Sequence, residues 1–264
     1  MSRSFLPTDF RLSCSFGRSE TPHEFFEGDM ALVEKRFKEF CQKKLGREPT
    51  IPNIIHFIWL GGPLPDKFKP YIDSWSHFHP VKLWTEKEES QLNWIHPWAK
   101  LLYEDAQNFA EKSDILRYEI LFQHGGIYSD IDVFCLKPFD DLLTSGLSFF
   151  AGQETNQGPL YLCNAVLGSA KGHPILHFCL ENIASQSMAP NQPIFSRTGQ
   201  ALLTRAAVPH LQNERLLVLP CSYFYPLPFF EDLSHKTFNF QDIQKKYLAP
   251  ESMALHLWAA TWYS

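Results

Sequence analysis

The sequence predicts an α/β fold in which helices flank a parallel or mixed, Rossmann-type sheet. Short apolar runs that are typical of buried strands alternate with segments whose apolar residues recur at helical spacing. Clusters of glycine and proline separate the two kinds of segment. With 264 residues, the chain is long enough for one large domain, and no linker divides residues 51–264.

The first 50 residues are expected to form an N-terminal extension with a single helix. Residues 1–27 have no clear period, and Asp29 is a candidate cap for a helix over Met30–Leu45 that stops at Gly46. One face of this helix is apolar: Leu32, Val33, Phe37, Phe40 and Cys41. We expect that face to pack on the core, although basic residues on the same helix leave open contact with a membrane surface or a partner.

Strands and helices then alternate through the rest of the chain. The expected strands are Ile54–Leu60, Val81–Thr85, Ile127–Val133, Phe149–Gln153, Ala165–Gly168 and Arg215–Pro220. The expected helices are Asp66–His77, Gln91–Phe109 with an interruption at Pro97, Ser113 to the Gly125-Gly126 pair, Asp140–Ser145, His173–Ser185 and Gly199–Ala207.

The segment SDILRYEILFQHGGIYSDID, residues 113–132, says most about function. Ser113 is a candidate helix cap, and the glycine pair ends the helix. Side chains alternate across a strand, so Tyr128, Asp130 and Asp132 are expected on one face. Two carboxylates at a strand end can hold a hard divalent cation, and that cation can hold a diphosphate.

An Asp-x-Asp triplet is weak evidence alone, because two solvated acids at a strand terminus fit it equally well. Residues i and i+2 of an extended strand lie roughly 6.6 Å apart. We therefore predict Asp132 as a direct metal ligand, and Asp130 as a ribose contact or a metal ligand through water. Asp114 and Arg117 lie on one side of the preceding helix, either as a surface ion pair or facing the ligand crevice.

These motifs resemble the DXD-type sugar transferases, which include fungal mannosyltransferases, bacterial polysaccharide enzymes and the catalytic domains of large glucosylating toxins. SDILRY followed by GGIYxDxD resembles the family's core. Further segments resemble it in the same order: IPNIIHFIWLGG (51–62), NAVLGSAKGHP (164–174), TGQALLTRA (198–206), YFYPL (223–227) and HLWAATW (256–262).

The resemblance implies a GT-A-like domain over residues 51–264 that transfers a sugar with retention. The donor would be a nucleotide-sugar, most simply a UDP-sugar carrying a hexosyl or N-acetylhexosaminyl group, and the acceptor a glycan or a protein. Mn²⁺ or Mg²⁺ would serve as cofactor. The resemblance also implies that Trp59 stacks on the nucleotide base and that Asp114 and Arg117 hydrogen-bond the donor sugar. Tyr128 would line the pocket and Asn164 would lie near the sugar. Core packing for Trp59 and a turn for Asn164 are the plainer alternatives.

Aromatic residues crowd the end of the chain, where either a core strand or a lid over the diphosphate would explain them. In the lid interpretation His256 completes the metal shell or contacts a phosphate oxygen, and Trp258 and Trp262 contact the donor. Thr261 stands where the family often has Ser, and Gln200 where it often has Pro. The difference at Gln200 weakens what the resemblance implies about the role of the loop that contains the Thr198-Gly199 pair.

Composition narrows the function classes. A net charge of −5 argues against nucleic-acid binding. No apolar run approaches the ~20 residues of a transmembrane helix, and residues 1–16 contain no signal-peptide core. The six cysteines are scattered, which favours reduced thiols, with Cys135, Cys163 and Cys179 buried. We expect a cytoplasmic protein, or a bacterial effector exported without a cleaved signal peptide.

Two other functions fit parts of the sequence. DIDV matches an aspartate-nucleophile phosphohydrolase motif, for which Lys171 and the pair Glu231-Asp232 are candidate partners. That interpretation leaves Trp59 and the helix before the acidic motif unexplained. A catalytically inactive module that binds nucleotide-sugars is the second alternative.

Overall fold

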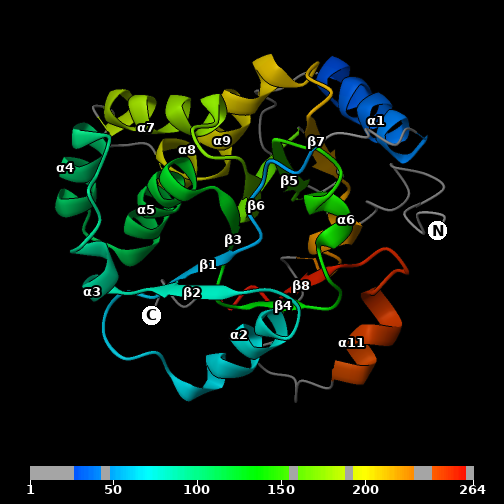
Figure 1. Cartoon of the computed structure of the whole chain (residues 1–264), viewed down its shortest axis with the longest axis horizontal. Helices are drawn as coiled ribbons and strands as arrows, with labels where there is room; N and C mark the ends of the chain where they lie inside the picture. The colour runs from blue at the N-terminus through cyan, green and yellow to red at the C-terminus, as the bar shows by residue number, and fades with distance from the viewer. Residues whose placement is uncertain (1–26, 43–47, 155–159, 188–192, 229–239, 260–264) are drawn as a thin grey trace.

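The computed structural model describes residues 27–42, 48–154, 160–187, 193–228 and 240–259. It shows a mixed central sheet flanked by helices, as the sequence predicts (Figure 1). One large apolar cluster includes residues from the main sheet and from most of the helices around it, and a smaller cluster includes residues of β8 and α11. No helix among the described residues is long and apolar enough to cross a membrane.

The elements alternate along the chain much as expected. The strands are β1 (Ile55–Ile58), β2 (Val81–Trp84), β3 (Gly126–Ser129), β4 (Val133–Cys135), β5 (Phe149–Gln153), β6 (Leu162–Ser169), β7 (Leu216–Leu219) and β8 (Ala254–His256). The α-helices are α1 (Glu27–Gln42), α2 (Lys69–Ser76), α3 (Glu86–Glu89), α4 (Pro97–Asp105), α5 (Phe109–His124), α6 (Asp140–Leu143), α7 (Pro174–Ser187), α8 (Ile194–Arg197), α9 (Gln200–Ala207), α10 (Cys221–Phe224) and α11 (Phe240–Tyr247). Two 3-10 helices are η2 (Asp66–Phe68) and η3 (Val208–His210).

The main sheet has six strands in the order β2-β1-β3-β6-β5-β7. Strand β1 runs parallel to β2 and β3, whereas β6 is antiparallel to both β3 and β5. β1 and β3 therefore end at the same edge of the sheet. Open α/β sheets bind ligands at the carboxyl ends of their parallel strands, so the acidic motif after β3 lies where a ligand is expected.

The acidic motif is a turn and not part of a continuous strand, so the prediction that its side chains alternate along Ile127–Val133 is wrong. β3 ends at Ser129, and the Asp130 N–H donates to the Ala165 carbonyl in the last bond toward β6 (2.8 Å). The Val133 N–H then donates back to the Asp130 carbonyl (3.2 Å). The chain turns here because β4 leaves the main sheet and pairs with β8.

Helix α5 begins earlier than predicted. Asn108 is its N-cap, and the Asn108 side chain accepts a hydrogen bond from the Glu111 N–H (2.8 Å). Ser113 lies inside the helix and is buried, so its predicted role as the cap is wrong. The predicted stop is confirmed: Gly125 has φ 66°, a backbone conformation that strongly favours glycine.

Two other helices differ from the prediction. Residues 91–96 are not helical, and α4 begins at Pro97, because a proline lacks the N–H that a helix interior needs. The described part of α1 spans Glu27–Gln42 rather than Met30–Leu45. Its residues Val33, Phe37 and Phe40 are buried in the same core as the sheet, which fits a packing role. The division of the chain at residue 50 stays a prediction.

The structure favours a core strand over a lid for the start of the C-terminal segment. β8 is buried and pairs antiparallel with β4, with His256 opposite Val133. Thr261 and Trp262 lie outside the described residues. The five cysteines among the described residues are free, and Cys135, Cys163 and Cys179 are buried as predicted.

Replacing Asn108 with Ala is expected to lower the free energy of unfolding by about 1 kcal/mol, because the helix loses its capping acceptor. Urea denaturation measures the loss. Asn108→Asp is the control, since aspartate keeps the acceptor and is expected to stay close to the parent. Equal stability of all three proteins would contradict the cap.

Removing the chain from His256 onward is expected to lower the free energy of unfolding by about 3–5 kcal/mol, because Asp132 loses its buried partner and β4 loses its pairing. Thermal melts without ligand measure this. Removal of residues 260–264 alone leaves every described contact in place and is the control. An unchanged melting temperature for the longer deletion would restore the lid interpretation.

Candidate active site

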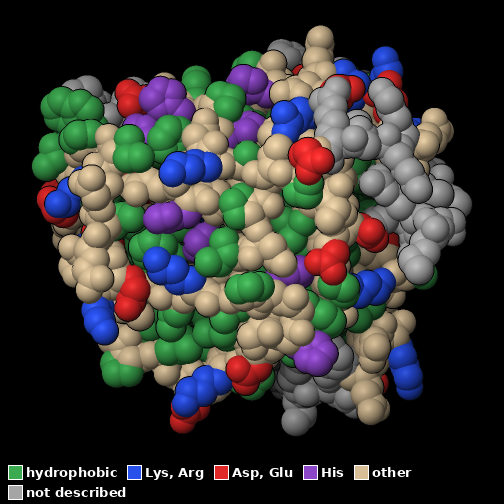
Figure 2. All heavy atoms as spheres, viewed as in Figure 1, with side chains coloured by type: hydrophobic (Ala, Val, Ile, Leu, Met, Phe, Trp, Pro, Cys, Tyr) green, Lys and Arg blue, Asp and Glu red, His purple; other side chains and the backbone are tan. Residues whose placement is uncertain are grey.

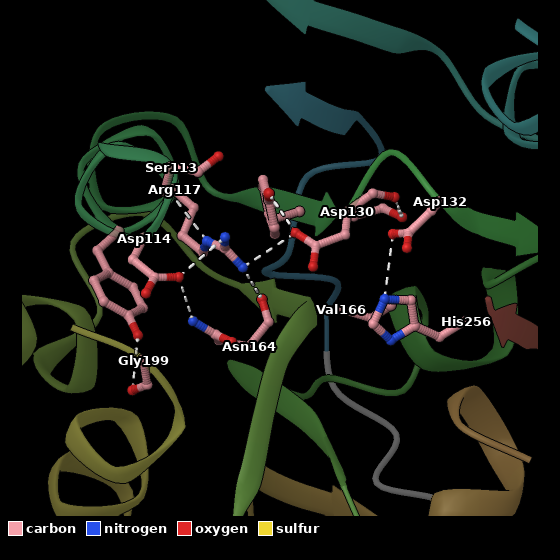
Figure 3. Close-up of polar contacts among 12 residues, drawn as sticks. Ser113, Asp114, Arg117, Asp130, Asp132, Asn164, Val166, Gly199 and His256 are labelled. Carbon is pink, nitrogen blue, oxygen red and sulfur yellow. Dashed lines mark hydrogen bonds and ion pairs between the residues drawn. The ribbon is translucent and has the colours of Figure 1, made fainter. Parts of the chain in front are cut away.

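Side chains from α5, from β6 and from the turn after β3 point toward one another at the carboxyl edge of the sheet (Figure 3). Asp114 and Arg117 come from α5, three residues apart, and both are buried. Because both are buried and paired with each other, the surface ion-pair alternative is wrong. That they face a ligand crevice stays a prediction. Asn164 lies within β6, not in a turn.

The guanidinium of Arg117 connects these elements. Its Nη2 lies 3.0 Å from Asp114 Oδ1, and its Nη1 lies 3.2 Å from Asp130 Oδ1. Nη1 also donates to the Asn164 carbonyl (2.8 Å), and Nε donates to the Ser113 carbonyl (3.2 Å). A guanidinium offers five N–H donors in a fixed plane, so one buried residue sets the relative positions of two carboxylates.

Asp114 is held through both of its carboxylate oxygens. Asn164 Nδ2 donates to Oδ1 (2.8 Å), and Thr198 Oγ1 donates to Oδ2 (2.9 Å). The Tyr118 hydroxyl donates to the Thr198 carbonyl (2.8 Å), which ties α5 to the residue that follows α8. Burial raises the pKa of Asp114, and the charge of Arg117 opposes that rise.

Asp130 is fixed by an aromatic residue of β3, the strand that precedes it. The Tyr128 hydroxyl donates to Asp130 Oδ1 (2.6 Å), and the Arg117 guanidinium lies over the Tyr128 ring, 4.4 Å from its centre. Burial raises the pKa of Asp130, and Arg117 opposes that rise. The contacts from Tyr128 and Arg117 both reach Oδ1, so Oδ2 is the oxygen that remains for a ligand.

Asp132 is held by the C-terminal strand. His256 Nε2 lies 3.2 Å from Asp132 Oδ1, and the Ala259 N–H donates to Oδ2 (2.7 Å). Burial alone would raise the pKa of Asp132, but His256 and these hydrogen bonds bring it below its usual value. Burial likewise opposes charge on His256, yet the Asp132 carboxylate outweighs it and raises the pKa of His256.

Asp130, Asp132 and His256 could together hold a metal ion, because one ligand atom from each lies within 4.8 Å of the others. The turn bends the backbone at Asp130 and Asp132, in place of the extended strand in which residues two apart lie roughly 6.6 Å apart. Three carboxylates in this region outnumber one guanidinium and the imidazole of His256, so an excess of negative charge remains that a divalent cation would offset. Carboxylate oxygens with one imidazole suit Mn²⁺ well, and Mg²⁺ less well.

Trp59 lies at the same edge of the sheet. It directly follows β1, whose residue His56 pairs in register with Tyr128, so Trp59 and Asp130 extend from neighbouring strand ends. The indole is half-buried and packs against Phe68, with ring centres 5.2 Å apart. This position is compatible with base stacking and with core packing, so the stacking role stays a prediction.

Trp258 lies beside His256, with ring centres 4.0 Å apart. Its backbone has φ 51°, a conformation rare for a residue with a side chain. The indole N–H donates to the Leu227 carbonyl (2.7 Å), and the ring also packs near Tyr225. Trp258 therefore supports His256 and has its N–H already engaged. The predicted role of Trp262 falls outside the described residues.

Sequence reasoning missed two parts of this arrangement. The role of Thr198 in holding Asp114 was not assigned, although a Thr-Gly pair just before a helix was a visible signal. Glu154, directly after β5, was also missed. Gln200 Nε2 donates to Glu154 (3.2 Å), and burial raises the pKa of Glu154 to about 7, against the opposing charge of His256. An acid that follows a buried strand was the available signal.

Comparison with known proteins identifies the family. A family model described as "Glycosyltransferase sugar-binding region containing DXD motif" matches residues 65–148. An uncharacterized glycosyltransferase of Acanthamoeba polyphaga mimivirus is 30% identical over 193 residues, which cover 69% of this chain and 76% of the relative. Inositol phosphoceramide mannosyltransferase 3 of Schizosaccharomyces pombe is 34% identical over 140 residues, 51% of this chain. The match spans only 37% of that yeast protein.

Among solved structures, the UDP-bound glycosyltransferase domain of the YGT toxin superposes with a TM-score of 0.53 at 12% identity. The match covers 66% of this chain and 80% of the toxin domain, and it shows that the two share the GT-A fold. The extent of the viral match, together with the DXD family model, places the sequence among these enzymes. The chain therefore belongs to the DXD-motif glycosyltransferase family.

Proposed function

We propose that this protein transfers a sugar, with retention of configuration, from a nucleotide-diphosphate donor to an acceptor in a reaction that needs Mn²⁺ or Mg²⁺. The observation that carries the proposal is the cluster of Asp130, Asp132 and His256 beside the Arg117 guanidinium. A UDP-sugar is the donor we favour, because the YGT toxin domain with the same fold is UDP-bound.

Each side chain of the cluster has a distinct proposed role. Asp132 and His256 would bind the cation directly, and Asp130 Oδ2 would bind it through water or accept a bond from the ribose. When bound, the cation would neutralise the charge that grows on the leaving diphosphate. The hydrogen bonds that hold Asp132 and Asp130 in place limit reorganisation during the reaction.

The donor sugar would lie against Asp114, Arg117 and Asn164. Four contacts already engage most of the N–H groups of Arg117, so we propose that it mainly positions the two carboxylates and offers its remaining Nη2 proton to the sugar. Tyr128 would shape the pocket, and Trp59 would stack on the base. Trp258 would support His256, and Trp262 would contact the leaving group.

No residue stands out in the sequence as a general base, which agrees with the retaining chemistry of the family that the sequence resembles. In that family the departing phosphate takes the acceptor's proton. Burial raises the pKa of Glu154 to about 7, so Glu154 is expected to exchange a proton near neutral pH. It is therefore a second candidate, besides the departing phosphate, for the proton acceptor. Activity that survives Glu154→Gln would leave the phosphate as the proton acceptor.

The sugar and the acceptor are less constrained. The yeast relative is named for a mannosyl transfer to inositol phosphoceramide, but this chain spans about a third of that protein. We propose a hexosyl or N-acetylhexosaminyl group, with a glycan, a lipid-linked sugar or a protein as acceptor. A cytoplasmic location and peripheral membrane contact stay predictions from sequence.

The phosphohydrolase alternative is less well supported. Tyr128 and Arg117 both bond Asp130, and that engagement would hinder a nucleophile. Lys171 is exposed, and the pair at 231–232 lies outside the described residues. An inactive binding module differs from the proposed enzyme only in turnover, so turnover is the measurement that separates them.

Asp132→Asn is expected to lower metal-dependent turnover by on the order of a hundredfold or more, because one charge that stabilises the transition state is lost. The assay incubates the chain with a panel of nucleotide-sugars and Mn²⁺ and measures free UDP and sugar. Asp141→Asn, an exposed carboxylate, is the control. Normal turnover of the Asp132 variant would refute the metal role, and phosphate release from simple esters would favour the hydrolase.

Trp59→Ala is expected to weaken UDP binding by about 1–3 kcal/mol if the indole stacks on the base. Equilibrium titration with UDP and Mn²⁺ measures the change. Trp98→Ala removes an exposed indole on α4 and is the matched control. Unchanged UDP affinity together with a large drop in melting temperature would identify Trp59 as a core residue.

A further inference from the structure

A second group of potential metal ligands lies among the helices, separate from the acidic turn. It consists of His96, just before α4, with His177 and Glu181 on α7. One ligand atom from each lies within 4.8 Å of the others. His177 and Glu181 are four residues apart on one helix, which places both side chains on the same face.

The distances suit a small ion after modest movement. His96 Nε2 and His177 Nδ1 lie 3.0 Å apart, and His96 Nε2 lies 4.0 Å from Glu181 Oε1. Tetrahedral zinc with bonds of about 2.0–2.1 Å separates its ligand atoms by roughly 3.3–3.4 Å. The imidazoles need to separate slightly, and the side chain of Glu181, which is 53% exposed, can rotate inward.

The buried histidine is oriented as metal-binding histidines commonly are. His96 Nδ1 lies 2.7 Å from Glu119 Oε2, and the Glu119 side chain is fully buried. The other oxygen of Glu119 accepts from the Ile95 N–H (2.6 Å) and from Gln123 Nε2 (2.6 Å). This carboxylate keeps the proton on Nδ1 of His96, so the Nε2 lone pair faces His177 and Glu181.

The site is open on one side. His96 is buried, while His177 and Glu181 are exposed, so an ion could enter from solvent and keep a water as its fourth ligand. Figure 2 shows histidine side chains gathered on the face where α7 lies in Figure 1. Two imidazoles and one carboxylate favour a borderline transition metal over Mg²⁺ or Ca²⁺.

We propose that His96, His177 and Glu181 form a second metal site, which binds Zn²⁺ and fastens the start of α4 to α7. The ion would replace the hydrogen bond between the two imidazoles. Both helices pack against α5, which carries Asp114 and Arg117. The ion would therefore stabilise the helices that hold α5 in place. This proposal does not depend on the proposed transfer reaction.

The test titrates Zn²⁺ into the full chain carrying Asp130→Asn and Asp132→Asn, which weakens metal binding at the acidic turn. One equivalent is expected to bind. Co²⁺ is expected to give the visible absorption of a four-coordinate site, and zinc is expected to raise the melting temperature by several degrees. Adding His177→Asn should lower zinc affinity by on the order of tenfold or more. Adding Glu181→Gln should lower it by less.

His177 is exposed, so His177→Asn is expected to melt normally in EDTA, and a loss of zinc binding cannot then be blamed on misfolding. His77→Asn, at an exposed histidine outside the cluster, is the control and should bind zinc as before. Absence of zinc binding by a double variant that still melts cooperatively would overturn the site. An unchanged number of bound zinc equivalents when His177→Asn is added to the otherwise unsubstituted chain would also overturn it. The Glu119–His96 pair would then be only a structural anchor for α4.

Discussion

The buried charge of Arg117 is the constraint on which the site depends. Its guanidinium is surrounded by Asp114, Asp130 and two backbone carbonyls, and a charge removed from water in this way needs such partners. Asp114 is buried and Asp130 is partly buried, and both carboxylates pair with the guanidinium. Loss of one partner from such a group typically costs about 3–5 kcal/mol, so stability and ligand geometry cannot be separated at these positions.

A second constraint comes from the two sheets. The chain leaves the main sheet after β3 and joins β8 through β4, and the acidic turn is the short path between them. That path bends the backbone and brings Asp130 and Asp132 within reach of one ion, together with His256. The pairing of β4 with β8 in the smaller sheet positions Asp132, whereas the hydrogen bond from the Asp130 N–H to β6 of the larger sheet positions Asp130.

Much of the fold could be predicted from sequence, because the spacing of apolar residues and the backbone preference of glycine act locally. The strands β1, β2 and β5, the stop at Gly125 and the acidic pair follow from such signals. The turn at Asp130–Asp132 could not be predicted, because it depends on β4 pairing with a strand far along the chain. Ser113 was mistaken for a cap because Asn108, the actual cap, begins the helix before its apolar period becomes clear. Thr198 was missed because its partner Asp114 is distant in sequence.

The pairing of β4 with β8 has a consequence for how the molecule is made. During synthesis, Asp130 and Asp132 emerge long before His256, and until that strand docks the turn has neither its imidazole nor the Ala259 N–H. Domains acquire structure as they emerge, and pairings between distant segments form late. A ribosome-bound fragment that ends before β8 would therefore carry the acidic motif without the partners of Asp132, and the proposed cation site would assemble only after β8 had been made.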